Sequence, residues 1–301
     1  MSRMTIGVDL GGTFLKAGLV SPTGKLIGEV VRLPVTRGSP GPELARAVAS
    51  AAAAVCSTVR VRAIGVAIPA SVRAPGGQVA RGTSNLHGLE GFALRSAVAR
   101  LTGLPVVVGN DANLAALGEA RAGAAQGTRN SLLLTLGTGI GSGLILDGKL
   151  WEGSRGYGAE FGIAATRPLR AIGLPDRWML LEEIVSAEAL RGWAGGPSKD
   201  VFARAARGHA KARRAVEIVC EYLGMAVMNA HLLLDLQMVV LGGGMANAGA
   251  RLGHGVERQF RKLCPRAYQG NVKVRIAKLG DAAGVVGAGL FALDHLKGRH
   301  P

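Results

Sequence analysis

Aromatic residues are scarce in this sequence. Phe, Trp and Tyr together make up 4% of its 301 residues, whereas hydrophobic residues of all kinds reach 48% and glycine occurs 46 times. A core must therefore be built from Ala, Val, Leu and Ile, with glycine at tight turns and close backbone contacts. This composition is typical of an α/β enzyme of one large or two medium domains, and it excludes disorder over most of the chain.

Cysteine is also rare. The three cysteines, Cys56, Cys220 and Cys264, lie more than forty positions apart and form no C-x-x-C pair. This spacing excludes a local zinc knuckle and argues against a disulfide scaffold. We therefore expect that the protein resides in a reducing compartment.

Long hydrophobic runs are missing. No run reaches the roughly 18 apolar residues of a membrane span. Asp9 interrupts the amino-terminal segment before the apolar core of a signal peptide could form. We therefore expect a cytoplasmic protein without a membrane partner.

Acidic residues are outnumbered by basic ones. The 36 Lys and Arg against 20 Asp and Glu give a formal net charge of +16, which attracts nucleic acid, an acidic membrane surface or a polyanionic substrate. An arginine-rich chain also results from genome composition alone. The densest basic run, residues 204–214, has no interleaved aromatic residues for base stacking, so we interpret it as a solvated helix face.

Apolar patterning and turn residues predict an alternation of strands and helices. The expected strands are residues 4–8, 16–20, 63–68, 105–108, 131–136, 144–146 and 238–241, and the expected helices are residues 42–57, 92–101, 113–122, 180–193, 200–208, 210–234 and 282–296.

Two glycine-rich turns join pairs of these strands. In the first, residues 9–13 (DLGGT), glycines allow backbone N–H groups to approach a polyanion, Thr13 adds a hydroxyl donor, and Asp9 is suited to hold Mg²⁺ through water. Alone, this motif would more often be an ordinary hairpin turn. The second turn, residues 137–143 (GTGIGSG), repeats the arrangement. The pair is therefore expected to hold different parts of one phosphate chain across a cleft.

Neither turn matches the two common nucleotide motifs. The sequence has no G-x-x-x-x-G-K-[ST], and neither turn opens a helix as a dinucleotide fingerprint does. A P-loop and a Rossmann site are therefore excluded.

With these paired turns the sequence resembles the actin-like sugar kinases, and within them the ROK family of repressors, open reading frames and kinases. The matching segments are residues 6–13 with Lys16, 84–86, 109–113, 137–143, 158–162, 181–182, 242–244 and 281–288, which span essentially the whole chain. The resemblance implies an α/β fold class with two actin-like, ribonuclease-H-like domains and a cleft between them. The implied domains are residues 1–111 and 112–301, with a terminal helix at about residues 282–296 packing back on the first domain.

The activity that the resemblance implies is that of a hexose kinase, with glucokinase favoured, which transfers the γ-phosphoryl group of ATP to the 6-hydroxyl of glucose with Mg²⁺. Asp111 matches the catalytic base of the family. It follows a buried strand at its carboxyl end, where ligands gather in α/β sheets. The alternative role for Asp111 is the N-cap of the helix expected over residues 113–122.

The other matching residues fall into two sets. The sugar-binding set is Ser84, Asn85, Asn110, Asp111, Glu160 and Glu182. The phosphate and nucleotide set is Asp9, Gly11, Gly12, Thr13, Lys16, Gly137, Thr138, Gly139, Gly242, Gly243 and Gly244, with Asp9 as the Mg²⁺ residue. The open alternatives are turn positions for the asparagines, a solvated helix position for Glu182, and a helix-opening turn for the three glycines.

The sequence departs from the family where most members bind a structural zinc through a His and a cysteine cluster. Ile163 stands at the His position, and residues 166–180 contain no Cys or His, so we expect no structural zinc. An altered acceptor pocket or a phosphate-binding lid would suit the large side chains found here instead, and Trp178 could alternatively pack as a hydrophobic plug. These side chains are Arg167, Arg170, Arg177 and Trp178.

Loss of this His, which contacts sugar in family members, leaves other functions open. One alternative is a non-catalytic or weakly catalytic sugar-binding regulator. Another is a kinase for a different hexose or an N-acetylhexosamine, or one that uses polyphosphate as donor. Family repressors carry a DNA-binding module ahead of the first hairpin, which begins here at Met4, so we expect no sequence-specific nucleic acid binding. The resemblance also implies a homodimer.

Overall fold

The computed structural model describes residues 4–55, 60–73, 78–81, 86–167 and 177–298. The chain divides into two compact units. The first unit comprises residues 1–127, 149–159 and 281–301, and the second comprises residues 128–148 and 160–280. Residues 112–127, which we expected beyond the domain boundary, group with the first unit, and the helix over residues 111–122 packs on the terminal helix.

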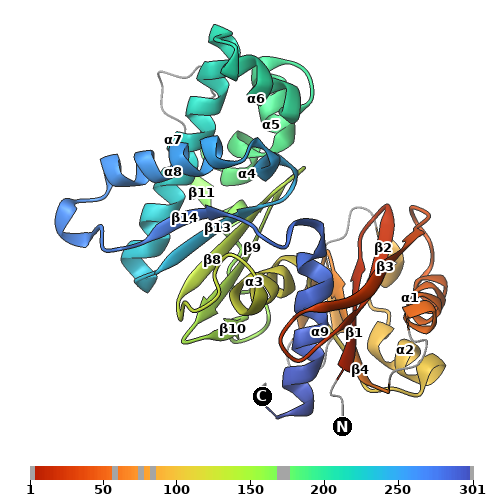
Figure 1. Cartoon of the computed structure of the whole chain (residues 1–301). Coiled ribbons are helices and arrows are strands. Elements are labelled where there is room, and N and C mark those ends of the chain that lie inside the picture. Colours follow the sequence, from red (N-terminus) through yellow and green to blue (C-terminus); the bar gives the residue numbers. More distant parts are fainter. Residues whose placement is uncertain (1–3, 56–59, 74–77, 82–85, 168–176, 299–301) are drawn as a thin grey trace. The chain divides into compact units, whose positions relative to one another are not determined.

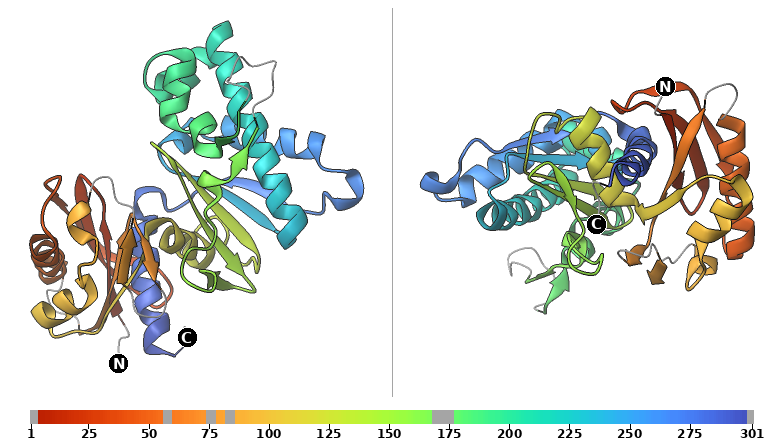
Figure 2. Two further views of the ribbon diagram at one scale, coloured as in Figure 1. Left: turned by 180° about the vertical axis from the view of Figure 1, so that it is seen from behind. Right: turned by 90° about the horizontal axis from the view of Figure 1, so that it is seen from below.

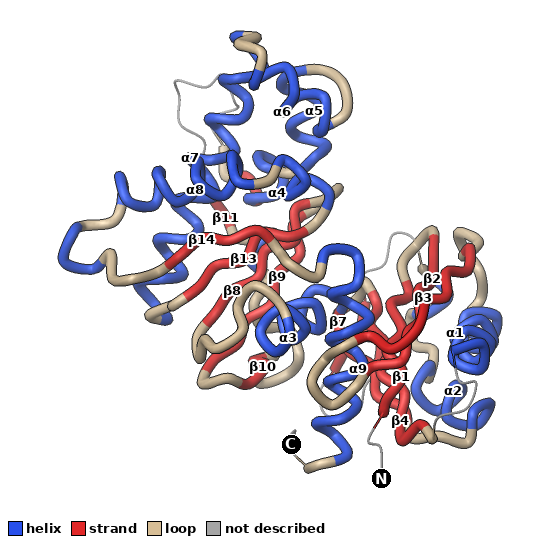
Figure 3. The backbone as a smooth tube through the Cα atoms, viewed as in Figure 1, coloured by secondary structure: helices blue, strands red, loops and turns tan. Residues whose placement is uncertain are grey.

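The first unit is built on a five-stranded sheet with the strand order β3-β2-β1-β4-β7 (Figure 3). β1 (Met4–Leu10), β2 (Phe14–Val20) and β3 (Leu26–Pro34) are antiparallel neighbours. β4 (Val61–Ile68) and β7 (Val106–Asn110) run parallel to β1. The parallel strands are nearly continuous apolar runs because helices cover both faces of the sheet.

Four helices make up these two covering layers (Figure 2). α1 (Gly41–Val55) and α2 (Leu94–Thr102) pack on one face. On the other face α9 (Ala283–Leu296) packs across β1 and β4, and α3 (Asp111–Ala122) lies against α9. The unit also contains the short strands β5 (Ser71–Arg73), β6 (Gln78–Arg81) and β10 (Lys149–Trp151).

Glycine allows α9 to lie directly on the sheet. A Cβ atom at Gly7 of β1 would overlap the carbonyl of Val285, and one at Gly65 of β4 would overlap the carbonyl of Ala288. The buried Thr5 hydroxyl donates a hydrogen bond of 2.7 Å to the carbonyl of Gly289. The backbone of α9 therefore contacts the strands without intervening side chains.

The second unit has the strand order β9-β8-β13-β14. β9 (Ile140–Leu146) is antiparallel to β8 (Ser131–Leu136), whereas β13 (Met238–Gly242) and β14 (Lys273–Ile276) continue the sheet in parallel. The helices of this unit are α4 (Leu181–Val185), α5 (Ala187–Ala194), α6 (Ser198–Ala206), α7 (Ala210–Leu234) and α8 (Ala250–Leu263) (Figure 1). The strands β11 (Ala165–Thr166) and β12 (Met179–Leu180) form a small antiparallel pair.

α7 is the central helix of the second unit and contacts α4, α5, α6 and α8. Among the described residues it is the one helix long and apolar enough to span a membrane, but 56% of its apolar window is buried inside the unit. That burial is the behaviour of a core helix.

The prediction of one continuous helix over residues 180–193 is wrong. The chain forms two helices, α4 and α5, with a break at Ser186, whose backbone is extended. The Ser186 hydroxyl accepts a 3.2 Å hydrogen bond from the amide of Ala189, so it is the N-cap of α5. Sequence patterning also missed β3, β14 and α8.

The close packing of α9 predicts the effect of a single methyl group. Gly65→Ala should lower the free energy of unfolding by about 1–3 kcal/mol or more, because the new Cβ forces α9 away from β4. Gly192→Ala is the control, since a Cβ at this position in α5 meets no atom within 4 Å. Urea denaturation should show little change or a gain for the control. Equal stability of Gly65→Ala and the wild type would contradict direct packing of α9 on the sheet.

Candidate functional site

Charged residues gather at the carboxyl edge of the first unit's sheet. Asp9 of β1 is level with Ala67 of β4, which is level with Gly109 of β7. Because neighbouring strands lie about 4.8 Å apart, the Cα atoms of Asp9 and Gly109 are about 10 Å apart. Asp111 follows two residues after Gly109. The structure therefore brings the predicted Mg²⁺ residue and the predicted base to one edge.

Asp9 lies in a small network of charges. Its Oδ2 atom is 3.8 Å from the Nζ atom of Lys16, its cross-strand neighbour on β2. Lys16 also donates a 3.2 Å hydrogen bond to the carbonyl of Asp281 and lies 3.7 Å from the Asp281 carboxylate. Burial raises the pKa of Asp9, opposed by Lys16 and reinforced by the negative charge of Asp281. A cation beside Asp9 would relieve this cost.

The donor set at Asp9 fits Mg²⁺. Carboxylate oxygens are its preferred protein ligands, and Mg²⁺ usually keeps several waters and binds through one or two carboxylates plus phosphate oxygens. Asp9 and Asp281 supply two such groups. Across the described part of the chain, no cluster of three or more His, Cys, Asp or Glu side chains is placed to hold a metal.

The first glycine-rich turn connects β1 to β2. The amide of Gly11 donates a 3.0 Å hydrogen bond to the carbonyl of Phe14, and the carbonyl of Thr13 accepts one of 2.9 Å from Val35. Gly12 is half-buried and Thr13 is exposed. The turn is thus held by its ends, with Thr13 accessible to a ligand.

Asn110 and Asp111 lie where β7 becomes α3. Asn110 is the N-cap of α3: its Oδ1 accepts a 3.0 Å hydrogen bond from the amide of Asn113, and its Nδ2 donates to the carbonyl of Ala70 at 3.2 Å. The alternative role of N-cap therefore belongs to Asn110 and not to Asp111. Asp111 is the first residue of α3, half-buried, and its Oδ1 accepts from the amide of Ala112 at 2.8 Å. The helix amino terminus stabilises its negative charge.

The second glycine-rich turn is shorter than the predicted residues 137–143, because β9 already begins at Ile140; residues 137–139 connect β8 to β9 in the second unit. The amide of Gly137 donates a 2.9 Å hydrogen bond to the carbonyl of Gly139, and Thr138 is exposed. The carboxylate of Glu182 reaches this turn from α4 and accepts a 3.1 Å hydrogen bond from the amide of Ile140. A Cβ at Gly139 would lie 2.6 Å from Oε2 of Glu182. A side chain at position 139 would therefore displace the Glu182 carboxylate from this turn.

The triple glycine lies beside this turn. β13 pairs with β8 up to Gly242, and a Cβ at Gly243, which has φ +79°, would lie 2.6 Å from the carbonyl oxygen of Leu136. Gly244 has open space around it and begins a 3-10 helix over Gly244–Ala248. The structure thus places all of the second unit's predicted phosphate and nucleotide residues at the adjacent ends of β8 and β13.

Glu160 and Glu182 lie close enough to influence each other. Partial burial raises the pKa of Glu160, and the negative charge of Glu182 raises it further. The chain around Glu160 is held on both sides, by Ala159 at φ +66° and by the amide of Phe161, which donates a 2.9 Å hydrogen bond to Ser142. Two neighbouring carboxylates of this kind suit recognition of hydroxyl groups.

Glu183 differs from Glu182 in what it contacts. Its carboxylate accepts a 2.6 Å hydrogen bond from the amide of Leu180 and pairs with Arg177 at 3.2 Å. Glu183 therefore caps the amino terminus of α4. Glu182 faces the second turn, so it does not occupy the solvated helix position that was its alternative role.

Two large side chains are exposed in the part of the chain that replaces the family's zinc-binding residues, Ile163 and residues 166–180. Ile163 is 54% exposed and Trp178 is 67% exposed, so the interpretation of Trp178 as a hydrophobic plug is wrong. β11 and β12, at the two ends of residues 165–180, pair with each other. Ser84, Asn85 and Arg170 lie outside the described residues.

Two residues at the first turn received no role from sequence reasoning. Asp281 lies in the matching segment 281–288, but its contact with Lys16, 265 positions away, could not be predicted from that match. Arg32 lies level with Lys16 on β3, with its guanidinium 3.8 Å from the ring centroid of Phe14. Because β3 was not predicted, Arg32 could not be assigned to this face.

Comparisons with known proteins agree on one family. The sequence profile of the ROK family matches residues 5–295. A glucokinase of Halalkalibacterium halodurans is 30% identical over 95% of this chain and 94% of its own. An N-acetylmannosamine kinase of Salmonella arizonae is 31% identical over 96% of this chain and 98% of its own. A ROK family glucokinase from Streptomyces griseus, solved in complex with glucose and AMPPNP, superposes with a TM-score of 0.79 at 28% identity, over 96% of this chain and 99% of that one.

The pairing of the two glutamates predicts a shift in titration. Glu182→Gln should lower the pKa of Glu160, because it removes a negative charge that disfavours the ionised form. Since burial remains, the pKa should stay above the ordinary value for glutamate. Carboxyl carbon chemical shifts followed against pH measure this directly.

The matched control for this titration is Glu183→Gln. Glu183 is engaged with Leu180 and Arg177, so its loss should leave the pKa of Glu160 where it is. An unchanged pKa of Glu160 in Glu182→Gln would show that the two carboxylates do not interact.

Proposed function

The chain belongs to the ROK family, and from this we propose that it is an ATP-dependent hexose kinase with glucose as the favoured acceptor. The single observation that carries the proposal is the edge of the first unit's sheet. There Asp111, at the amino terminus of α3, follows Gly109 by two residues, and the Cα atom of Gly109 is about 10 Å from that of Asp9, the ion-pair partner of Lys16. This arrangement puts the proposed proton acceptor and the proposed phosphate-binding turn at one edge of the sheet.

Asp111 would act as the general base. The proton of the sugar 6-hydroxyl passes to its carboxylate while the hydroxyl oxygen bonds to the γ-phosphorus, and the bond from that phosphorus to the bridging oxygen breaks to leave ADP. A carboxylate accepts the proton of a hydroxyl group efficiently when it is ionised and held in one orientation. The α3 terminus favours the ionised form, and the hydrogen bond from Ala112 fixes the carboxylate.

The phosphate side would use the glycine-rich turns. In the first unit Lys16 supplies positive charge and Thr13 an accessible hydroxyl. In the second unit Gly137, Gly139 and Gly243 leave backbone free of side chains at neighbouring strand ends. Asp9, with Asp281, would hold Mg²⁺, which supplies charge neutralisation at the phosphate oxygens when bound.

The sugar side would use Glu160, Glu182 and Asn110. The hydrogen bond from Ile140 leaves Glu182 with further lone pairs for a sugar hydroxyl. Asn110 has one amide hydrogen bonded to Ala70 and a second still available. Ser84 and Asn85 complete the proposed sugar set from outside the described residues.

A second acceptor is supported by one comparison. The similarity to an N-acetylmannosamine kinase is as high as that to a glucokinase, and Ile163 stands exposed where most family members have a sugar-contacting His. These two observations support an N-acetylhexosamine or a different hexose as an alternative acceptor. Polyphosphate as donor stays a further alternative. A cytoplasmic location and a homodimer stay predictions.

Replacement of the proposed base gives a direct test. Asp111→Asn should lower kcat by about 10²–10⁴-fold, because the amide cannot accept the hydroxyl proton, and should leave the dissociation constant for glucose nearly unchanged. The control is Asp147→Asn, which changes an exposed carboxylate paired with Arg129 in a hairpin turn. Initial rates and calorimetric sugar binding measure the two effects. Retention of most of the kcat by Asp111→Asn would rule out Asp111 as base.

The acceptor and donor are tested by a panel. Glucose, mannose, fructose, N-acetylglucosamine and N-acetylmannosamine are each offered with ATP and with polyphosphate, and sugar phosphate is measured. We expect the highest kcat/KM for glucose with ATP. Sugar binding without any phosphorylated product would identify a regulator instead of a kinase.

A further inference from the structure

The charged side chains at the carboxyl edge of the first unit's sheet form a row across three strands. Asp9 of β1 is level with Lys16 of β2, and Lys16 is level with Arg32 of β3. Residues directly opposite one another on neighbouring strands point to the same face of a sheet. This is the face on which α9 lies, because a Cβ at Gly284 would be 2.9 Å from the carboxyl carbon of Asp9. α1, which covers the other face, therefore does not cover the row.

The two cations of this row differ in what balances their charge. The Nζ atom of Lys16 lies 3.8 Å from the carboxylate of Asp9 and 3.7 Å from that of Asp281. Arg32 is exposed, and among the described residues its side chain has no partner for an ion pair or a hydrogen bond. The positive charge of Lys16 is thus shared by two carboxylates, whereas that of Arg32 has no carboxylate beside it.

An aromatic ring holds the Arg32 side chain beside the first glycine-rich turn. The guanidinium carbon lies 3.8 Å from the centroid of the Phe14 ring. Phe14 is the first residue of β2 and directly follows Thr13, which is exposed in the turn. A cation–π contact of this kind orients the guanidinium without an oxygen acceptor. The N–H donors of Arg32 are therefore placed next to the turn and are not used by a protein oxygen.

The strand order puts Arg32 and the proposed base on opposite sides of Asp9. In the order β3-β2-β1-β4-β7, Arg32 lies two strands from Asp9 in one direction, and Gly109 lies two strands away in the other. Each of these steps of two strands spans about 10 Å. Consider a phosphate chain bound at Asp9 with its transferred phosphoryl group toward Asp111. Its remaining phosphates extend toward Arg32.

On the basis of the kinase function proposed above, we propose that Arg32 binds the β-phosphate of the donor nucleotide. Its guanidinium donates hydrogen bonds to two nonbridging oxygens of that phosphate. The planar guanidinium matches the spacing of two phosphate oxygens, which a single ammonium group does not. Arg32 thus holds the part of the donor that remains in ADP after transfer.

A contact with the β-phosphate acts on both nucleotide binding and phosphoryl transfer. When the bond from the γ-phosphorus to the bridging oxygen breaks, its electron pair stays with the β-phosphate, so the negative charge of that phosphate increases. A cation held beside it stabilises the departing group more than it stabilises bound ATP. Arg32 should therefore raise the affinity for nucleotides that carry a β-phosphate and should also raise kcat. The affinity for the sugar should not depend on it.

Calorimetry of the full chain with ADP and with AMP, each in the presence of Mg²⁺, tests this contact without turnover. Arg32→Gln should weaken ADP binding about tenfold or more, because a charged hydrogen bond is lost. It should leave the affinity for AMP, which has no β-phosphate, nearly unchanged. Arg32→Lys should recover part of the ADP affinity, because it restores the charge but not the planar pair of donors. The ratio of the ADP and AMP dissociation constants would not change if Arg32 were only structural.

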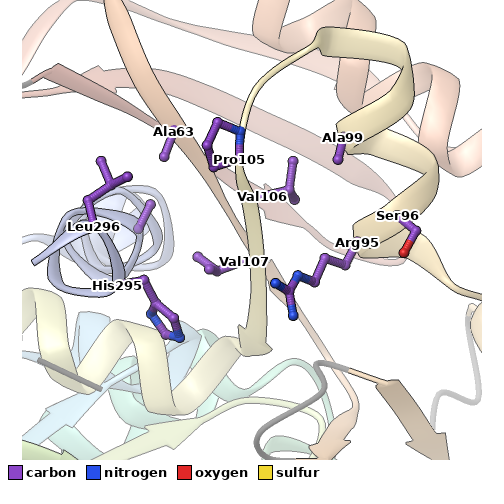
Figure 4. A pocket seen from close by; sticks show the side chains of 10 residues that line it. Ala63, Arg95, Ser96, Ala99, Pro105, Val106, Val107, His295 and Leu296 are labelled. Carbon is purple, nitrogen blue, oxygen red and sulfur yellow. The ribbon is translucent and has the colours of Figure 1, made fainter. Parts of the chain in front are cut away.

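The matched control is Arg95→Gln, which removes the same charge from another exposed arginine of the first unit. Arg95 extends from α2 toward Val107 of β7, in the lining of a cavity near the amino ends of β4 and β7 (Figure 4). These ends form the edge of the sheet opposite to Asp9. Arg95→Gln should therefore bind ADP and AMP like the wild type. In initial-rate measurements, Arg32→Gln alone should lower kcat/KM for ATP about tenfold or more, with an unchanged KM for glucose.

Two results would overturn this role of Arg32 and leave the kinase function in place. One is equal ADP affinity of Arg32→Gln and Arg95→Gln in a protein whose wild type phosphorylates glucose. The other is an equal weakening of ADP and AMP binding by Arg32→Gln. A wild type that binds no adenine nucleotide would instead overturn the proposed function, and the role of Arg32 with it. Circular dichroism melts establish that each variant is folded.

Discussion

The first unit depends on the direct contact between α9 and the strands beneath it. Gly7 and Gly65 remove the side chains that would otherwise separate them, so that helix carbonyls lie against strand backbone. This contact determines where the amino terminus of α9 lies, and with it the positions of Asp281 and Gly284 beside Asp9. A helix displaced outward by one side chain would leave Lys16 with one acidic partner instead of two. The charge network at the first turn is thus a consequence of backbone packing.

Two carboxylates of the candidate site lose part of their hydration through burial. Asp9 and Glu160 each carry a raised pKa because part of their hydration is lost on folding. Such groups are costly in the empty protein and gain most from a ligand that supplies positive charge or hydroxyl donors. Asp9 has Lys16 beside it, whereas Glu160 has another carboxylate, Glu182. The two positions are therefore suited to different ligands, a cation with phosphate at Asp9 and hydroxyl groups at Glu160.

Local patterns were sufficient for some features of the fold and insufficient for others. The hairpin at residues 9–13 and the whole of α7 could be predicted, because turn glycines and a 25-residue apolar periodicity are properties of short segments. The break at Ser186 could not, since Ser is tolerated inside helices and the amide of Ala187, next to the break, donates to the distant carbonyl of Gly137. The pairing of Lys16 with Asp281 and the exposure of Trp178 depend on long-range packing, which periodicity does not contain.

Ala159 shows what a single methyl group does to the path of the chain. It occupies the left-handed region at φ +66°, where an L-residue with a Cβ costs about 1–2 kcal/mol. Glycine would occupy this region freely and would also occupy many others, so the polypeptide entering Glu160 would take a wider range of directions before folding. The methyl group therefore raises the energy of the observed backbone conformation, but it also removes competing conformations of the unfolded chain. The backbone that leads into Glu160 therefore has fewer conformations open to it before folding.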